Sequence, residues 1–381
     1  MPQYDVIVIG TGGVGSATLY HLARRGVRVL GIDRFPPGHD RGSSHGQTRM
    51  IRLAYYEHPD YVPLLRRAYD LWHELEQVAE KKLYLPVGVL AGGPPDGELI
   101  SGMLRSAAQH KLQLEQFSAQ EVALHWPGYR LPDNFCGLLE RRAGYLMVED
   151  CVIAHAEIAQ RSGAELQCNS EVRSWHVDDD GVIVKTDRET YSAARLVITA
   201  GAWASDLLQT LRVPLHVLRK PLFWYRTQSS TYRLESGCPC FLFETLGGIF
   251  YGFPQSNELG VKLAEHTGGR IVDDPLQIDR TLDAADQQRI ETCLANHLPG
   301  VSSECAAHAV CMYTMTPDGH FVVGPHPEHP QVSFAAGLSG HGFKFTSVLG
   351  EIMADLALDG KTQYPINFLA HQRFTQRSSD G

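Results

Sequence analysis

The chain opens with Tyr4-Asp5-Val6-Ile7-Val8-Ile9, which runs directly into Gly10-Thr11-Gly12-Gly13-Val14-Gly15. The apolar run before the glycines predicts a buried strand, and the apolar-periodic segment 17–23 after them predicts a helix. A second apolar run, 27–32, predicts the next strand and ends at Asp33. Because this G-x-G-x-x-G pattern follows a strand, opens a helix and precedes an acid at the end of another strand, it predicts a dinucleotide-binding βαβ unit.

Each part of this unit has a physical role in holding a dinucleotide. Gly10 permits a tight turn, Gly12 lets the backbone approach a pyrophosphate, and Gly15 lets the helix pack closely on the strand. The helix N-terminus offers free N–H groups and a partial positive charge to the phosphates. The Asp33 carboxylate can accept hydrogen bonds from the ribose hydroxyls of an adenosine.

The composition predicts a soluble globular protein. The chain has 381 residues and a formal net charge of -9 at pH 7, which disfavours partners such as nucleic acid or an acidic membrane surface. We expect no membrane span, because no apolar run is long enough, and no signal peptide, because the first predicted strand begins at Tyr4. The eight cysteines lack C-x-x-C zinc spacing, so we expect no metal site, reduced thiols and a cytoplasmic location.

The rest of the chain predicts a mixed α/β fold. Residues 196–200 lack polar alternation, as a strand buried in a parallel sheet does. The acid triplet 178–180 before Gly181 predicts a hairpin turn rather than a metal site. Because βαβ elements lie at both ends and in the middle of the chain, we expect a discontinuous dinucleotide domain and a second, β-rich substrate domain. The expected segments are 1–85, 148–212 and 305–375 for the first domain, and 86–147 and 213–304 for the second.

A second glycine-rich loop near the C-terminus is a candidate site. Gly337, Gly340 and Gly342 precede a predicted helix over 343–358, with Lys344 in its first turn. A cation there opposes the helix dipole and is tolerated more easily if an anion, such as a reduced flavin, sits at the same helix end. The alternative is an exposed lysine in a solvated turn.

Two further groups of polar residues are ambiguous on spacing alone. Lys262 and His266 share one face of a predicted strand, which could line a polar cavity, although a solvent-facing surface is favoured. Arg49 and Arg52 follow His45 and would be neighbours on a helix, either as a carboxylate-binding pair or as a structural or phosphate-binding patch.

The cysteine at position 311 does not stand out on physical grounds. A lone cysteine among apolar residues is most often an inert, small hydrophobic side chain. Nothing in its sequence surroundings places Cys311 above Cys136 or Cys293 as a reactive thiol.

Taken together, these stretches resemble the monomeric sarcosine oxidase family, which includes N-methyltryptophan oxidase, over residues 4–374. The markers are the Gly10–Gly15 turn with Asp33, the segment 42–49 with Arg52, Tyr251-Gly-Phe-Pro254, Lys262 with His266, 309–314 around Cys311, and 337–345. The resemblance implies a Rossmann-like FAD-binding domain of glutathione-reductase type with a second, β-rich substrate domain.

The resemblance also implies roles for individual residues. It implies FAD bound covalently through the Cys311 sulfur, a thiol that should have a lowered pKa or a nearby cation. It implies a substrate carboxylate held by Arg52 and Lys344, and a Lys262 cation that helps the reduced flavin react with oxygen. The remaining residues implied to line the flavin or substrate site are Gly10, Gly12, Gly13, Val14, Gly15, Asp33, Arg34, Ser44, His45, Arg49, Val172, Gly201, Trp203, Tyr251, His266, Met312, Tyr313, Gly337, Gly340, Gly342 and Phe343.

The expected activity is oxidative demethylation of a small N-methyl amino acid by O2, giving formaldehyde, the primary amino acid and H2O2. Sarcosine is favoured because residues 309–330 look more like sarcosine oxidase than N-methyltryptophan oxidase. Leu242 and Gln47 depart from the family pattern, which puts the substrate in doubt. The alternatives are an N-methyltryptophan or cyclic secondary amino-acid (pipecolate or proline-like) oxidase, a deaminating amino-acid oxidase, a nicotinamide-dependent dehydrogenase and a non-catalytic cofactor module. The resemblance points to a monomer.

Overall fold

The computed structural model describes residues 3–211 and 213–375, which form two large sheets and one small sheet. The eight-stranded sheet contains β1 Tyr4–Ile9, β2 Val29–Ile32, β9 Glu165–Gln167, β10 Val172–Asp178, β11 Gly181–Thr186, β12 Thr190–Ile198, β19 Val322–Pro325 and β20 Val332–Ala336. The nine-stranded sheet contains β5 Val89–Gly93, β6 Glu115–Ser118, β7 Cys136–Glu140, β13 His216–Thr227, β14 Cys240–Thr245, β15 Gly248–Phe253, β16 Val261–Glu265, β17 Arg270–Val272 and β18 Val301–Met315. The small sheet contains β3 Thr48–Ile51, β4 Tyr84–Leu85 and β8 Gly144–Met147.

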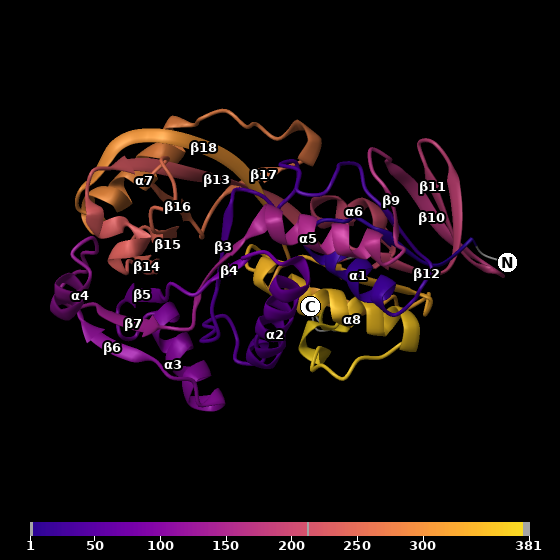
Figure 1. The fold of residues 1–381 in the computed structure, drawn as a ribbon, viewed down its shortest axis with the longest axis horizontal. Helices are drawn as coiled ribbons and strands as arrows, with labels where there is room; N and C mark the ends of the chain where they lie inside the picture. Colours follow the sequence, from indigo (N-terminus) through magenta and orange to yellow (C-terminus); the bar gives the residue numbers. More distant parts are fainter. Residues whose placement is uncertain (1–2, 212, 376–381) are drawn as a thin grey trace.

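Helices cover these sheets. They are α1 Gly13–Arg24, α2 Tyr61–Ala79, α3 Glu98–His110, α4 Ala119–His125, α5 Val148–Arg161, α6 Ala204–Leu207, α7 Ala284–His297, α8 Thr346–Asp359 and α9 Gln372–Thr375. In Figure 1 the β10–β11 hairpin lies towards one end of the long axis and β13–β16 towards the other, with α1, α5 and α8 between them. None of the helices in the described ranges combines the length and apolar character needed to cross a bilayer.

The core of the eight-stranded sheet is parallel and joins distant parts of the chain. β1 pairs in parallel with β2 and with β12, and β12 pairs in parallel with β20. Val8 and Val197, which face each other across β1 and β12, are both fully buried. Burial on both faces explains why the segments 4–9 and 196–200 are apolar without alternation.

Small residues let the helices pack tightly around this sheet. A Cβ atom on Gly350 of α8 would overlap Ala17 of α1, so these two helices approach more closely than larger residues would allow. A Cβ atom on Gly15 would overlap the Gly10 carbonyl oxygen, which confirms the close helix–strand packing expected at the first turn.

The expected mixed α/β fold with a second, β-rich part is confirmed. The predicted hairpin at 178–181 is present as the β10–β11 turn, in which Asp178 pairs with Gly181. The division into two discontinuous domains stays a proposal, and residues 1, 2 and 212 of those ranges lie outside the described residues.

One local expectation, a solvent-facing Lys262, was wrong, and two others differ from the structure in detail. Arg49 lies on strand β3 and Arg52 just after it, because the segment pairs with β8 instead of forming a helix. The predicted helix over 343–358 begins as a 3₁₀ turn, Phe343–Phe345, so Lys344 precedes the α-helix proper. The Lys262 side chain is buried and not solvent-facing, because Gly46 and Thr48 and the rings of Trp224 and Phe253 cover it.

Candidate active site

A cavity of about 400 Å³ runs from the end of β1 to the wall of the nine-stranded sheet. At one end it is lined by Gly10, Asp33 and the start of α1, and at the other by Leu242 and Tyr251 of β14 and β15. The cavity therefore lies at the carboxyl ends of the parallel strands, where ligands bind in open α/β sheets.

The glycine turn forms the first end of the cavity. Gly10 has a positive φ of 84°, and a Cβ atom there would lie 2.6 Å from the Thr199 carbonyl oxygen, so only glycine fits without strain. The Gly13 N–H at the start of α1 donates to Ser44 Oγ over 3.2 Å. Asp33 accepts from the Thr11 N–H over 2.6 Å, which fixes the carboxylate beside the turn.

The next part of the wall suits an adenosine. Arg34 forms an ion pair of 2.8 Å with Glu171, and its guanidinium lies over the Trp203 ring, 5.4 Å from the centroid. Val172 and Gly201 line the cavity beside them.

Three buried polar atoms in this cavity, among the described residues, have no protein partner. Within the described residues, Trp203 Nε1, Thr314 Oγ1 and Thr346 Oγ1 are buried and have no hydrogen-bond partner, and all three residues line the cavity. Unpaired buried polar groups are unfavourable, and a dinucleotide carries the hydroxyl, phosphate and ring heteroatoms that would pair with them. Together with the glycine cradle, these residues fit FAD.

Arg52 lies at the far end of the cavity in an ion pair. Its guanidinium donates to both carboxylate oxygens of Glu57 over 2.8 Å and to the Ala54 carbonyl oxygen over 2.9 Å. Tyr55 and Tyr56 lie against the same guanidinium. Although burial acts in the opposite direction, Arg52 lowers the pKa of Glu57 to about 2, so the pair is charged.

Lys344 is a second buried cation near this pair. Its ammonium donates to the His341 carbonyl oxygen over 2.8 Å and lies 3.5 Å from Tyr55 Oη. Burial, followed by repulsion from Arg52, lowers the pKa of Lys344 to about 7. Among the described residues, Glu57 is the carboxylate whose charge acts on Lys344, and it is already paired with Arg52, so an incoming carboxylate would supply a further counter-charge.

His266 stands on the opposite wall with two tyrosines. Its ring centroid lies 6.4 Å from that of Tyr251 and 5.8 Å from that of Tyr313. Burial lowers the pKa of His266 to about 3, so the imidazole is neutral. This wall is aromatic and uncharged, which suits the apolar part of a small ligand.

Cys311 lies directly behind the wall. Arg49 Nη2 is 3.1 Å from Cys311 Sγ, and the thiol lies 3.4 Å from the Ser43 carbonyl oxygen. Burial alone would raise the pKa of this thiol, but the Arg49 charge and a hydrogen bond with His45 outweigh it and lower the pKa to about 6. A thiolate is therefore the main form at neutral pH.

Lys262 lies behind the same wall. Its ammonium donates to the Gly46 carbonyl oxygen, and to the carbonyl and hydroxyl oxygens of Thr48 over 2.9 Å each. The aromatic rings of Trp224 and Phe253 cover it at 5.4 and 4.8 Å. Burial, together with the Arg49 charge, lowers the pKa of Lys262 well below its usual range.

Most of the residues expected at the site line this one cavity. They are Gly10, Gly12, Gly13, Val14, Asp33, Arg34, Ser44, Arg49, Arg52, Val172, Gly201, Trp203, Tyr251, His266, Met312, Tyr313, Gly337, Gly340, Gly342, Phe343 and Lys344. Four others, Gly15, His45, Lys262 and Cys311, lie behind the lining.

Sequence reasoning missed Glu57 and His341, both of which line the cavity. His341 Nδ1 lies 2.6 Å from Tyr55 Oη, so it belongs to the same polar end as Lys344. His341 stands in the second glycine loop, which could have indicated it, whereas no pattern in the sequence marks Glu57.

Comparisons with known proteins agree with this geometry. The family model described as "FAD dependent oxidoreductase" (DAO) matches residues 5–356. Monomeric sarcosine oxidase from Streptomyces avermitilis is 42% identical over 378 residues, which cover 98% of each chain. N-methyl-L-tryptophan oxidase from Citrobacter koseri is 37% identical over 376 residues, covering 98% of this chain and 100% of the relative.

A solved structure adds to these relatives. NikD, described as an unusual amino acid oxidase essential for nikkomycin biosynthesis, superposes with a TM-score of 0.86 at 28% identity, covering 96% of this chain and 97% of NikD. The chain therefore belongs to the family of FAD-dependent oxidoreductases, in the group that contains the monomeric sarcosine oxidases and N-methyl-L-tryptophan oxidases.

Proposed function

We propose that the protein oxidises a small N-methyl amino acid, with sarcosine favoured, and uses O2 as the electron acceptor. The observation that carries this proposal is the pair of buried cations, Arg52 and Lys344, in the cavity that begins at the glycine turn. Such a pair selects a substrate with a carboxylate. Demethylation of sarcosine in this way gives glycine, formaldehyde and H2O2.

The substrate carboxylate would displace Glu57 from the Arg52 guanidinium. Both carboxylates would compete for the same Arg52 nitrogen, Nη2, so a ligand that lacks a carboxylate would not displace Glu57. The Lys344 ammonium would contact the substrate carboxylate as well. The neutral His266 ring and Tyr251 would then enclose the amine and its methyl group and exclude water.

FAD, when bound, supplies the two-electron oxidation of the carbon–nitrogen bond. The glycine turn, Ser44 and Asp33 would hold the dinucleotide, and Arg34 with Trp203 would hold its adenosine end. We propose that Cys311 would hold FAD through a carbon–sulfur bond, with Arg49 and His45 keeping the sulfur ionised. Forming this bond would replace the S–H bond of the thiol and a C–H bond of the flavin, and the two protons and two electrons released would pass to O2, giving H2O2.

Lys262 would provide a positive field where oxygen is reduced. Three oxygen acceptors surround its nitrogen, which matches the three N–H donors of an ammonium group. A fixed cation stabilises the negative charge that develops when oxygen accepts electrons.

The wall residues set how large a substrate side chain can be. Leu242, Met50 and Tyr56 line the cavity together with Arg52 and Lys344. We propose that these three side chains leave room for sarcosine and exclude the indole of N-methyltryptophan. We further propose that the protein acts as a monomer, as the names of its sarcosine oxidase relatives suggest, and that it is cytoplasmic, as its pattern of cysteines predicts.

Two measurements test the proposal. The first is a visible spectrum before and after acid precipitation: flavin that stays in the pellet, and is lost from it in Cys311→Ser, indicates covalent FAD. The second is peroxide formation with sarcosine, N-methyltryptophan and pipecolate. Formaldehyde release supports demethylation, ammonia release would indicate a deaminating oxidase instead, and no peroxide from any secondary amine would refute the assignment.

A further inference from the structure

Lys220 of β13 is a buried cation that the proposed reaction does not use. Its side chain is 2% exposed and lies outside the cavity lining. The ammonium donates to three successive backbone carbonyls, those of His266 over 3.1 Å, Thr267 over 2.7 Å and Gly268 over 3.2 Å. Three acceptors use all three N–H donors of the ammonium group.

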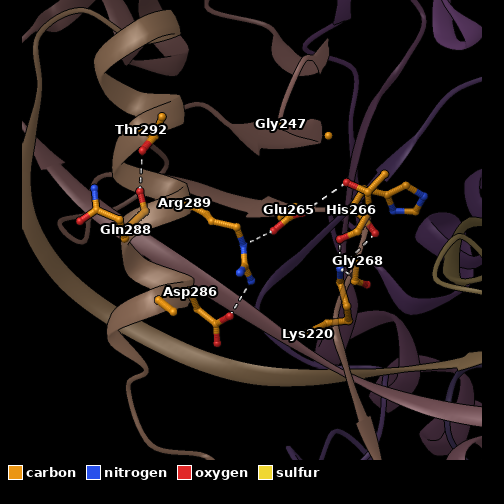
Figure 2. Close-up of polar contacts among 12 residues, drawn as sticks. Lys220, Gly247, Glu265, His266, Gly268, Asp286, Gln288, Arg289 and Thr292 are labelled. Carbon is orange, nitrogen blue, oxygen red and sulfur yellow. Dashed lines mark hydrogen bonds and ion pairs between the residues drawn. The ribbon is translucent and has the colours of Figure 1, made fainter.

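These carbonyls belong to the turn that leaves β16, and the turn is also held from its other side. The His266 N–H donates to the Ile249 carbonyl over 2.7 Å, and the Ile249 N–H donates to Thr267 Oγ1 over 3.1 Å. Glu265 is fixed by Arg289 of α7 over 2.8 Å. Figure 2 shows Lys220 beneath this turn and Arg289 between Glu265 and Asp286.

The turn carries the His266 imidazole. In Figure 2 the ring points away from α7, and it lines the cavity beside Tyr251 and Tyr313. The ring makes no hydrogen bond to another protein group within the described residues, so backbone and packing set its orientation. Its nitrogens are therefore open to a ligand.

Lys220 also lies against the ring of Tyr313, which lines the cavity beside His266. Its nitrogen lies 5.1 Å from the centre of the Tyr313 ring. In the β13–β18 register Lys220 is the direct partner of Cys311, two residues before Tyr313. One ammonium therefore contacts both the turn behind His266 and the ring of Tyr313.

We propose that Lys220 is a positioning residue that fixes the His266 imidazole and the Tyr313 ring against the substrate. Its own nitrogen touches neither substrate nor cofactor, so it acts through these two side chains. The kinetic part of this proposal rests on the proposed function, whereas the positional part does not. Burial lowers the pKa of Lys220 to about 8, as expected for an enclosed ammonium group.

The positional test is an NMR spectrum of the flavin-loaded protein with ¹³C at the histidine Cε1 position. The His266 signal is assigned by its loss in His266→Asn. Lys220→Met removes all three donors, and we expect the His266 signal to shift or broaden. Lys220→Gln retains two N–H donors and should give a smaller change. Lys81→Met, which removes an exposed lysine paired with Asp150, is the matched control and should change nothing.

The kinetic test is a double-mutant cycle on peroxide formation with sarcosine. Lys220→Met should lower kcat/KM by about 10²-fold, because small displacements in an active site have effects of this size. In the His266→Asn background the same substitution should have a clearly smaller effect, since the group it positions is absent.

Each outcome decides between positioning and a merely structural role. An unchanged His266 signal in Lys220→Met, or equal losses in both backgrounds, would overturn the proposal. If Lys220→Met fails to fold, Lys220→Gln carries both tests. If the wild type forms no peroxide, the proposed function fails, and the NMR comparison still decides the role of Lys220.

Discussion

Replacing Arg49 with glutamine should raise the pKa of Cys311 and change the pH at which covalent FAD forms. The Arg49 guanidinium lies 3.1 Å from the sulfur and is the main group that lowers its pKa, from the usual 9.0 to about 6. This difference corresponds to about 4 kcal/mol in favour of the thiolate. A unit charge about 4 Å away in a medium of effective dielectric constant near 20 supplies about the same energy.

The expected change in rate is smaller than the change in thiolate fraction. At pH 7 a thiol with a pKa of about 6 is roughly nine-tenths ionised, and one with a pKa of 9.0 is roughly one-hundredth ionised. The more basic thiolate is, however, intrinsically more reactive, by roughly 20-fold for a Brønsted slope of 0.4–0.5. The coupling rate at pH 7 should therefore fall only about fourfold.

The informative measurement is the full pH dependence of coupling. FAD is added to flavin-free protein, samples are precipitated with acid, and flavin in the pellet is measured over time from pH 5 to 10. The midpoint should lie near pH 6 in the wild type and near or above pH 9 in Arg49→Gln. Arg49→Lys should restore part of the shift, and Arg141→Gln, which removes an exposed arginine paired with Glu115, should leave the midpoint unchanged. Equal midpoints in the wild type and Arg49→Gln would show that Arg49 does not set the thiol pKa.

Three further predictions concern other parts of the site. The charged form of Lys344 binds carboxylates, and burial lowers its pKa to about 7. The Kd of acetate, read from the flavin spectrum, should therefore be constant below pH 7 and rise above it. Lys344→Met should abolish this pH dependence, and an unchanged pH dependence would contradict the role of Lys344 in carboxylate binding. Lys262→Met should slow reoxidation by O2 in stopped flow by about 10²–10³-fold while anaerobic reduction by sarcosine changes little, and equal losses in both would count against it. Gly15→Ala should lower the free energy of unfolding by about 1–3 kcal/mol and reduce the amount of flavin retained on purification, because the alanine Cβ atom would overlap the Gly10 carbonyl oxygen. A variant of unchanged stability that retains all of its flavin would refute the packing argument.

The parts of the fold that the sequence predicts are those set by local patterns. Helix α2 carries apolar residues at helical spacing, and Ser118 forms a capping box with Glu121 three residues later, so both can be read from the local sequence. The first βαβ unit is equally local, because its glycines, helix and acid lie within one short stretch.

The interactions that escaped prediction depend on tertiary pairing. The helical spacing of Arg49 and Arg52 was misleading because residues 48–51 form strand β3, which pairs with β8 almost a hundred residues later in the chain. The ion pair of Arg52 with Glu57 depends on how the loop after β3 turns into the cavity. The ionised state of Cys311 depends on a guanidinium that reaches it from β3. No periodicity in the sequence encodes such contacts.

The pairing of β1 with β12, and of β12 with β20, has a consequence for the order of events in the cell. The phosphate-binding turn leaves the ribosome well before β20 and before Phe343, whose ring stands close to Gly13, because both follow it by several hundred residues in the chain. A nascent chain that stops before β20 therefore carries the glycine motif without a complete binding site. We therefore expect the FAD site to be complete only once β20 and Phe343 have been synthesised.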